Sequence, residues 1–521
     1  MSVRVVSASQ AAELDRRAIA SGVNAMDLMR AAGRSAATLL LARFGGEAAA
    51  GVQVYAGAGN NGGDAWIVAA ELVRRGVPVC VVEVGEARSD EARTARGEAL
   101  SLLPGRVKRF GGRGEGGEAA MGVGDGVVVD GLLGYGASGA PRGDIARAIA
   151  VIASSRRPVV ALDVPSGVDA TTGETLGLFV RADLTVTFGS LKRGLLLNRD
   201  AAGAIVVTDI GFGAESERLH EAPALVDAVR ALDSLPQIAA GAHKGTRRRL
   251  LVVGGAPGMA GATVLAARAA MRSGVGMVKL VVAPESVAAV QAAQAAAMAL
   301  PWPSREAEAA AMTAWAQGLL IGPGIGHTPA ARTLVEWVLR TYDGPAVIDA
   351  DGLNVFEGDA AALGALIARR PCVVTPHAME FSRLASLPLA EVMARRFDVA
   401  GELARTLGAT VLLKGVPTVI SDGDVTEVCA TGTPVLATAG SGDVLAGIVA
   451  TILAQSGNAR GAAATGAWVH GRAAELAGRG TVRGVTLDDV VAALRDAWRA
   501  PATGEAPVLV ALPAVGDRAS A

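Results

Sequence analysis

The sequence predicts an α/β protein made of two domains, each with a sheet between two layers of helices. Three observations predict it. Short apolar, β-branched runs alternate with helical patterns from Val52 to about Ala500, as in parallel sheets with crossover helices. The 521 residues are too many for one ordinary hydrophobic core. Two glycine-rich loops, residues 57–64 and 439–443, each lie where an apolar run changes into a helical pattern.

The composition excludes several classes of function. The 49 basic and 50 acidic side chains nearly cancel, so we expect no nucleic-acid partner. Apolar stretches such as residues 444–454 are shorter than the ~20 residues of a membrane span, and the N-terminus has no secretory pattern. We therefore expect no membrane partner. Cys80, Cys372 and Cys429 form neither a disulfide framework nor a CxxC pair, which favours the cytoplasm.

The first half opens with a predicted βαβ unit. Residues 52–55 form a strand, residues 64–75 a helix that stops at Gly76, and residues 78–84 the next strand. The glycine loop lies at the first strand-to-helix turn, where dinucleotide-binding folds hold phosphates. Further strands are predicted at residues 127–129, 159–162, 184–188 and 205–208. The glycine-dense stretch 111–126 is predicted to be a surface excursion.

The strand pattern lapses between residues 215 and 243, so we place the domain boundary near Pro223. This predicts domains over residues 1–222 and 223–500, followed by a frayed tail over residues 501–521. In the second domain, strands are predicted at residues 250–253, 277–282, 318–321, 346–348, 372–375 and 410–413. Apolar positions at helical spacing follow the second glycine loop, and Gly457 closes that helix.

Polar side chains gather at three strand ends of the first half, residues 60–64, 130–136 and 163–169. In a parallel sheet these ends share one edge, where ligands bind. Asn61, Asp130 and Ser166 offer hard oxygen ligands suited to an alkali or alkaline-earth cation. Asp163 is a candidate general acid or base. The alternative is structural: a glycine-rich loop can be only a turn, and Asp163 can be only a turn cap.

In the second half, Gly440-Ser441-Gly442-Asp443 leads directly into the apolar helix. Backbone N–H groups there would face an anion, and Asp443 would face a reacting hydroxyl. Small-molecule kinases of the ribokinase type use this layout to stabilise a transferred phosphoryl group. Two residues of other motifs have structural alternatives, because His377 can lie in a capped loop or in the core, and Lys414 can be an ordinary cation at a strand end.

The first half resembles the NAD(P)H-hydrate epimerase family over residues 5–215, which implies a Rossmann-like domain. The resemblance depends on four ordered motifs: NNGGD, VDGLLGYG, DVPSGVDATTG and LTVTFGSLKRG. It implies that Asp163 is catalytic at the reactive ring and that Asn61, Asp130 and Ser166 bind potassium. The implied substrate contacts, besides Asp163, are Asn60, Asn61, Gly62, Gly63, Asp64, Gly134, Tyr135, Gly136, Ala137, Ser138, Gly139 and Ala140. Arg30-Ala31 departs from the family's usual Glu-Asn.

The second half is similar to the ADP/ATP-dependent NAD(P)H-hydrate dehydratase family over residues 225–500, which implies a ribokinase-like domain. The matching motifs, in order, are HKG, GG followed by MAGA, GPGIG, DADGLN, TPH, KG and GSGD. The implied contacts with the hydrated dinucleotide are Ala262, Gly326, His377 and Asp443. The implied contacts with the nucleotide are Lys414, Gly415, Val416, Pro417, Thr418 and Gly442. Arg248 and Thr433 stand where the family usually has glycine and asparagine.

Together the resemblances imply a bifunctional enzyme that repairs hydrated NADH and NADPH. The first half would interconvert the R and S hydrates at C6. The second would dehydrate the S hydrate with Asp443 as base, giving AMP and phosphate when ADP is used. Potassium, magnesium and ADP, or ATP, are the implied cofactors and co-substrate, and a homo-oligomer is the implied assembly. Two alternatives stay open: a small-alcohol kinase with a dinucleotide-binding module, and a non-catalytic dinucleotide sensor.

Overall fold

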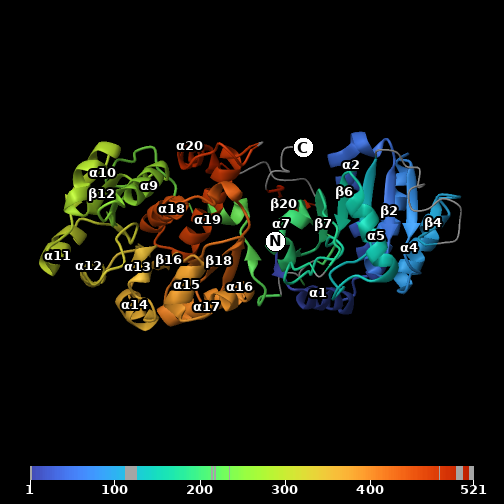
Figure 1. Ribbon diagram of the computed structural model, residues 1–521, viewed down its shortest axis with the longest axis horizontal. Helices are drawn as coiled ribbons and strands as arrows, with labels where there is room; N and C mark the ends of the chain where they lie inside the picture. The colour runs from blue at the N-terminus through green and yellow to red at the C-terminus, as the bar shows by residue number, and fades with distance from the viewer. Residues whose placement is uncertain are drawn as a thin grey trace. The chain divides into compact units, whose positions relative to one another are not determined.

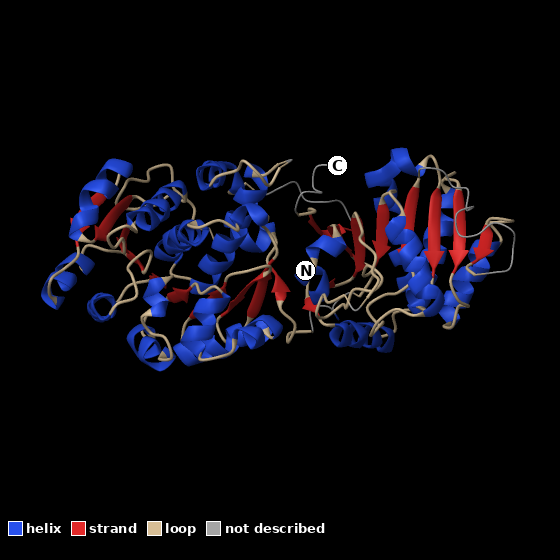
Figure 2. Ribbon diagram, viewed as in Figure 1, coloured by secondary structure: helices blue, strands red, loops and turns tan. Residues whose placement is uncertain are grey.

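The computed structural model divides into two compact units. It describes residues 3–111, 126–175, 177–212, 215, 219–233, 235–479, 481–499 and 508–515. Unit 1 contains Met1–Ala222 together with the C-terminal strand β20 (Val508–Leu512), and unit 2 contains Pro223–Ala502. Each unit is a sheet flanked by helices (Figures 1 and 2). The predicted α/β class is therefore confirmed.

Unit 1 is built on an eight-stranded sheet. Its strand order is β20-β9-β7-β6-β5-β2-β3-β4, and only the β20–β9 pair is antiparallel. The strands are β2 (Val52–Ala56), β3 (Val79–Glu83), β4 (Val107–Arg109), β5 (Val127–Gly131), β6 (Val159–Leu162), β7 (Leu184–Phe188) and β9 (Ala204–Thr208). A separate parallel pair joins β1 (Val5–Val6) to β8 (Leu191–Lys192). The helices are α1 (Ala8–Ala20), α2 (Ala25–Ala48), α3 (Asn60–Arg74), α4 (Asp90–Leu100), α5 (Gly143–Ser154), α6 (Arg193–Leu197) and α7 (Arg199–Ala202).

The two faces of this sheet have different cores, because successive strand side chains point to opposite faces. Val54 and Val129 pack with residues of α2, α3 and α4. Their neighbours Tyr55 and Val128 pack instead with residues of α5. The strands are therefore buried on both faces, which explains why they are almost continuously apolar.

Three expectations for unit 1 need correction or comment. Helix α3 begins at Asn60, not Asp64, because Gly59 is its N-cap and the glycine motif forms its first turn. A Cβ on Gly62 would overlap the carbonyl of Gly57, so this turn requires glycine. The expected frayed tail is wrong for β20, which pairs with β9. Residues 112–125 of the expected surface excursion lie outside the described residues.

Unit 2 is built on a ten-stranded sheet with the order β10-β19-β18-β17-β16-β15-β14-β11-β12-β13. Strands β11 to β17 are mutually parallel, and β18 is antiparallel to both its neighbours. The strands are β10 (Ala224–Leu225), β11 (Arg249–Val253), β12 (Met277–Val282), β13 (Met298–Pro301), β14 (Gly318–Ile321), β15 (Ala346–Ile348), β16 (Cys372–Val374), β17 (Thr410–Leu413), β18 (Thr418–Ser421) and β19 (Thr426–Cys429).

Small residues let the helices of unit 2 pack closely. At the contact between α9 and α18, a Cβ on Gly447 would overlap the carbonyl of Ala266. The helices are α8 (Ala228–Asp233), α9 (Ala260–Arg272), α10 (Val287–Ala293), α11 (Glu306–Thr313), α12 (Pro329–Thr341), α13 (Asp351–Asn354), α14 (Ala360–Ile367), α15 (Ala378–Ala385), α16 (Leu389–Ala394), α17 (Arg396–Leu407), α18 (Ser441–Ser456), α19 (Ala459–Ala477) and α20 (Leu487–Ala497). Within the described part of the chain, no helix is long and apolar enough to cross a membrane.

Both sheets contain a point where the strand order reverses. In unit 1 the reversal lies between β2 and β5, and in unit 2 between β11 and β14. The loops after these strands nearly touch: a Cβ on Gly57 would overlap the Leu132 carbonyl, and one on Gly254 would overlap the Pro323 carbonyl. Ligands bind at the carboxyl ends of strands at such reversals, so each unit has one favoured edge for a site.

Candidate active sites

A cavity of about 790 Å³ opens in unit 1 at the carboxyl ends of β2 and β5. Predicted site residues that line it are Asn60, Asn61, Asp64, Gly134, Tyr135, Gly136, Ala137 and Asp163. The other predicted contacts, Gly62, Gly63, Ser138, Gly139 and Ala140, are not among its lining residues. Gly63 has a packing role, because a Cβ there would meet the Met29 side chain and Ala92.

Asp163 is held in a strained and closely paired position. Its backbone has a φ of 64°, a region that non-glycine residues seldom adopt. The Lys192 ammonium lies 2.6 Å from its Oδ1, and both side chains are buried. The Tyr135 backbone N–H donates to Asp163 Oδ2 over 3.0 Å. Oδ1 is thus neutralised by Lys192, while Oδ2 faces the loop that begins at Gly134.

Sequence reasoning missed Lys192 as a site residue. The residue stands in the quoted LTVTFGSLKRG motif, and its burial directly beside Asp163 comes only from the fold. Its ammonium also contacts the Thr187 hydroxyl and the carbonyls of Phe188 and Ser190, at 3.0, 3.1 and 3.4 Å. The available signal was its place in that motif.

Two further carboxyl groups share the cavity with Asp163. Burial raises the pKa of Asp64 well above its usual value, and the like charges of Asp163 and Asp15 add to that rise. Burial also raises the pKa of Asp15, although a hydrogen bond from the Tyr135 hydroxyl opposes it. A carboxyl group of raised pKa, Asp64, and a carboxylate paired with lysine, Asp163, therefore line one cavity, which suits proton transfer in both directions.

The three predicted potassium ligands are adjacent in the structure. Asp130 is fully buried, and the Ser166 hydroxyl and backbone N–H donate to its two oxygens over 2.7 and 2.8 Å. Burial raises the pKa of Asp130 to about 6. The Asn61 amide nitrogen donates to the Leu133 carbonyl over 2.9 Å, and its buried Oδ1 has no partner among the described residues. An oxygen without a partner beside a buried carboxylate fits a hard monovalent or divalent cation.

In unit 2, Asp443 occupies the first turn of α18, after the N-cap Gly440 with a φ of 90°. Burial raises the pKa of Asp443 to about 7; Asp349 adds to the rise and Lys414 opposes it. A Cβ on Gly442 would lie 3.2 Å from the Lys414 ammonium. The helix N-terminus, a cation and a carboxyl group of high pKa thus meet, which suits a base beside an anion.

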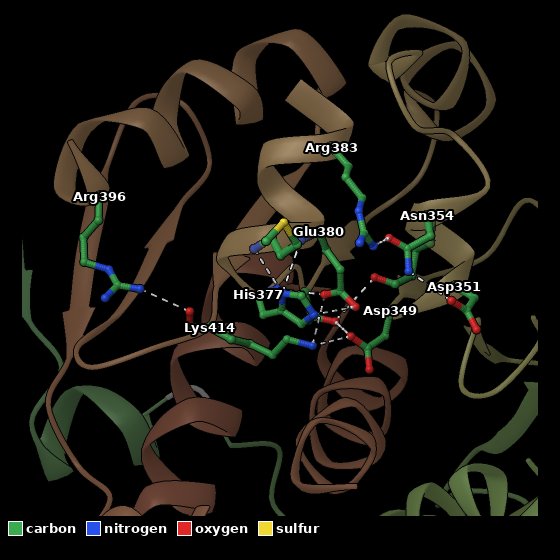
Figure 3. Close-up of polar contacts among 11 residues, drawn as sticks. Asp349, Asp351, Asn354, His377, Glu380, Arg383, Arg396 and Lys414 are labelled. Atoms are coloured by element: carbon green, nitrogen blue, oxygen red, sulfur yellow. Dashed lines mark hydrogen bonds and ion pairs between the residues drawn. The ribbon is translucent and has the colours of Figure 1, made fainter. Parts of the chain in front are cut away.

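Lys414 is the centre of a polar cluster (Figure 3). Its ammonium lies 2.8 Å from Asp349 Oδ1 and 3.6 Å from Glu380 Oε2. Burial opposes its charge, but these two carboxylates outweigh burial and raise the pKa of Lys414. Thr375 also donates to Asp349 Oδ1, and the buried Asp349 Oδ2 has no partner in the described part of the chain.

The other predicted dinucleotide contacts adjoin this cluster. His377 caps α15 by accepting from the N–H groups of Met379 and Glu380, and its backbone bridges to that of Lys414 (Figure 3). The Gly326 N–H donates to Asp351 over 3.1 Å. Ala262, in the first turn of α9, would lie 3.2 Å from a Cβ on Gly324. The N-cap role of His377 is thus a finding of the structure, and it is compatible with the expected contact with the dinucleotide.

The predicted nucleotide loop, residues 414–418, is held by Arg396, which sequence reasoning missed. The Arg396 guanidinium donates to the carbonyls of Val416 and Lys414 over 3.1 and 3.2 Å (Figure 3). A Cβ on Gly415 would overlap that guanidinium, so the loop requires glycine there. Burial lowers the pKa of Arg396. Pro417 and Thr418 lead into β18.

The three departures from the family patterns have visible roles. Arg248 stands where a glycine is usual and has a φ of 73°, so it occupies a conformation that glycine adopts freely. Thr433 caps a short helical turn by accepting from the Val435 N–H. Arg30 joins α2 to α4 through an ion pair with Glu98 at 2.7 Å.

Comparisons with known proteins match both halves. Residues 250–495 match the family described as NAD(P)H-hydrate dehydratase, and residues 25–194 match the YjeF-related protein N-terminus. A bifunctional NAD(P)H-hydrate repair enzyme of Coxiella burnetii is 35% identical, covering 93% of this chain and 97% of that protein. Its counterpart in Moorella thermoacetica is 36% identical over 91% and 92% of the two chains. The crystal structure of the Bacillus subtilis ADP/ATP-dependent NAD(P)H-hydrate dehydratase has a TM-score of 0.46 at 27% identity, covering 53% of this chain and 97% of that one.

Proposed function

The chain belongs to the family of bifunctional NAD(P)H-hydrate repair enzymes, and we propose that the cavity around Asp163 is its epimerase site and the cluster around Asp443 its dehydratase site. The protein is accordingly an epimerase in its first half and a dehydratase in its second. The observation that carries the assignment is that Asp163 lines the cavity at the carboxyl ends of β2 and β5, while Asp443 lies in the first turn of α18 beside Lys414.

Epimerisation at C6 requires the hydroxyl to leave one face of the ring and water to add to the other. The hydroxyl takes a proton and leaves as water, while the lone pair of the ring nitrogen forms a C6–N1 iminium. Asp64, with its high pKa, is suited to supply that proton. Asp163, with Oδ1 held by Lys192, is suited to take a proton from the water that adds. The two carboxyl groups then exchange roles for the reverse direction.

The proposed potassium site adjoins this cavity through Asn61. Asn61 Oδ1, the Asp130 carboxylate and the Ser166 hydroxyl are the atoms that would hold the ion. Bound there, the cation would neutralise Asp130 and fix Asn61, whose backbone follows Asn60 in the loop that lines the cavity. Potassium supplies charge and position, not a reacting group.

Dehydration of the S hydrate begins at its C6 hydroxyl. Asp443 removes the hydroxyl proton as the nucleotide's terminal phosphoryl group is transferred to that oxygen. Phosphate then leaves with the C6–O electron pair, a proton leaves C5, and the dihydropyridine ring is restored. Lys414 and the N–H groups at the start of α18 would stabilise the phosphoryl charge.

Magnesium would reach the dehydratase site on the phosphates of the nucleotide. Among the described residues, no group of three or more His, Cys, Asp or Glu side chains is placed to hold a metal ion. Magnesium commonly binds through substrate phosphates with one or two carboxylates, and Asp349 Oδ2 is the buried oxygen without a partner. ADP as phosphoryl donor, a homo-oligomer and a cytoplasmic location stay predictions.

The assignment is tested with a purified mixture of both hydrate epimers plus ADP or ATP, each epimer being followed by chromatography. Asp443→Ala should abolish nucleotide-dependent repair and leave epimer exchange intact. Asp163→Ala should abolish exchange, so that repair stops once the S epimer is consumed. Loss of both activities in one folded variant would contradict two separate sites. A released phosphorylated alcohol without recovery of absorbance at 340 nm would favour the kinase alternative, and ligand binding without turnover the sensor.

A further inference from the structure

Seven charged side chains line the cavity of unit 1, and their pairing is uneven. The acidic ones are Asp15, Asp64, Glu91 and Asp163, and the basic ones are Arg16, Arg88 and Lys192. Lys192 is committed to Asp163 at 2.6 Å, and Arg16 to Glu13 at 2.6 Å. Within the described ranges, Arg88 has no ion pair, so it is the cationic side chain of this cavity left to meet a ligand.

Arg88 is held beside the glycine loop. It lies in the connection from β3 to α4, directly before Ser89, the N-cap of α4. Its backbone N–H donates to the Ala58 carbonyl over 2.9 Å. The Ser89 hydroxyl donates to the Asn60 side chain over 2.6 Å. The backbone of Arg88 is therefore fixed against residues that line the cavity, while its side chain is exposed.

The acidic residues and Arg88 reach the cavity from different elements. Asp15 comes from α1, Asp64 from α3 and Asp163 from the end of β6, and Lys192 pairs with Asp163. Arg88 comes from the connection between β3 and α4, whose Ser89 binds Asn60 of the glycine loop. A hydrated dinucleotide brings a pyrophosphate, and in the NADPH form a 2′-phosphate as well. If its ring lies beside Asp163, its phosphates need a cation other than Lys192.

We infer that Arg88 binds a phosphate group of the hydrated dinucleotide in the epimerase site, an inference that rests on the proposed location of that site. The guanidinium fork matches two phosphate oxygens at once. The connection after the strand that follows the glycine loop is also where doubly wound folds recognise the ribose or its 2′-phosphate. Arg88 is thus a binding residue, acting on affinity and not on the reacting atoms.

The test is steady-state epimerisation of NADH hydrate and NADPH hydrate by the full chain with Arg88→Ala and Arg88→Lys. Arg88→Ala should raise KM about 10- to 100-fold with kcat nearly unchanged, the loss expected for a hydrogen bond to a charged group. Arg88→Lys should recover part of it, because charge returns without the fork. Arg74→Ala is the matched control: its side chain, 47% exposed and paired with Glu71, lies outside the cavity lining, and its KM should stay unchanged.

The two substrates identify the phosphate. An equal rise in KM for both hydrates assigns Arg88 to the pyrophosphate, and a rise for NADPH hydrate alone assigns it to the 2′-phosphate. Unchanged KM values for both hydrates, or a loss of kcat with KM unchanged, overturn the inference. Failure of the site itself has a different signature, because epimerisation would then survive Asp163→Ala.

Discussion

Replacing Lys192 by methionine should strongly destabilise unit 1. The substitution keeps the length and apolar stem of the side chain but removes the charge beside Asp163. The two side chains are 2% and 7% exposed and 2.6 Å apart, so the remaining carboxylate is left buried without its partner. Breaking such a pair typically costs about 3–5 kcal/mol. The exposed Arg16–Glu13 pair should cost at most about 1 kcal/mol when Arg16 is replaced by methionine.

The assay is urea unfolding, monitored by hydrogen exchange in peptides from β6 and β7, which report on unit 1 alone. With a slope of roughly 2–3 kcal/mol/M, a loss of about 3–5 kcal/mol lowers the midpoint by about 1–2.5 M. Asp163→Asn with Lys192→Met removes both charges, so the double variant should be more stable than the sum of the two single changes predicts. A shift for Lys192→Met as small as that for Arg16→Met would refute the reasoning.

Three further outcomes are expected. Above pH 6, potassium chloride should raise the melting temperature of unit 1 relative to tetramethylammonium chloride. This increase should vanish as the pH falls through about 6, because the cation needs ionised Asp130, and Asn61→Ala should reduce the increase. The kcat/KM of dehydration should fall as pH drops through about 7, where Asp443 loses its basic form, and Lys414→Met should move this limb to higher pH in a pH–rate profile, because Lys414 lowers that pKa. Arg248→Gly should stabilise unit 2 by about 0.5–1 kcal/mol in urea unfolding, because its φ of 73° favours glycine, and a destabilised variant would contradict this.

Central strands were predictable because their patterns are local. Predicted residues 159–162, 277–282 and 318–321 coincide with β6, β12 and β14, whose apolar runs are bounded by turn residues. The edge strands β4, β10, β13 and β20 were not predicted, and neither were β18 and β19. The strands β18 and β19 are short and carry polar residues, and β20 is specified only by its pairing with β9 across most of the chain. Pairing partners so distant leave no periodic signal.

The same distinction applies to the sites. Asp163 and Asp443 were predicted as site residues because each follows a recognisable strand or glycine loop. Asp15 was missed because its partner Tyr135 is 120 positions away, and no spacing rule links them. Arg396 was missed for a related reason, since its role is to bind the backbone of a loop contributed by a different element. Residues that act by supporting another residue are specified by the fold and seldom by a motif.

The two proposed reactions need different kinds of proton transfer. An epimerase works in both directions, so it needs a donor and an acceptor that can exchange roles, and Asp64 and Asp163 line the same cavity. The dehydratase works in one direction, because phosphoryl transfer and elimination follow each other. One carboxyl group is enough in the dehydratase site, namely Asp443 with its pKa of about 7. It removes the proton of the substrate hydroxyl as the phosphoryl group is transferred to the hydroxyl oxygen. Lys414, anchored by Asp349, can then serve the phosphoryl charge without neutralising Asp443 through a direct ion pair.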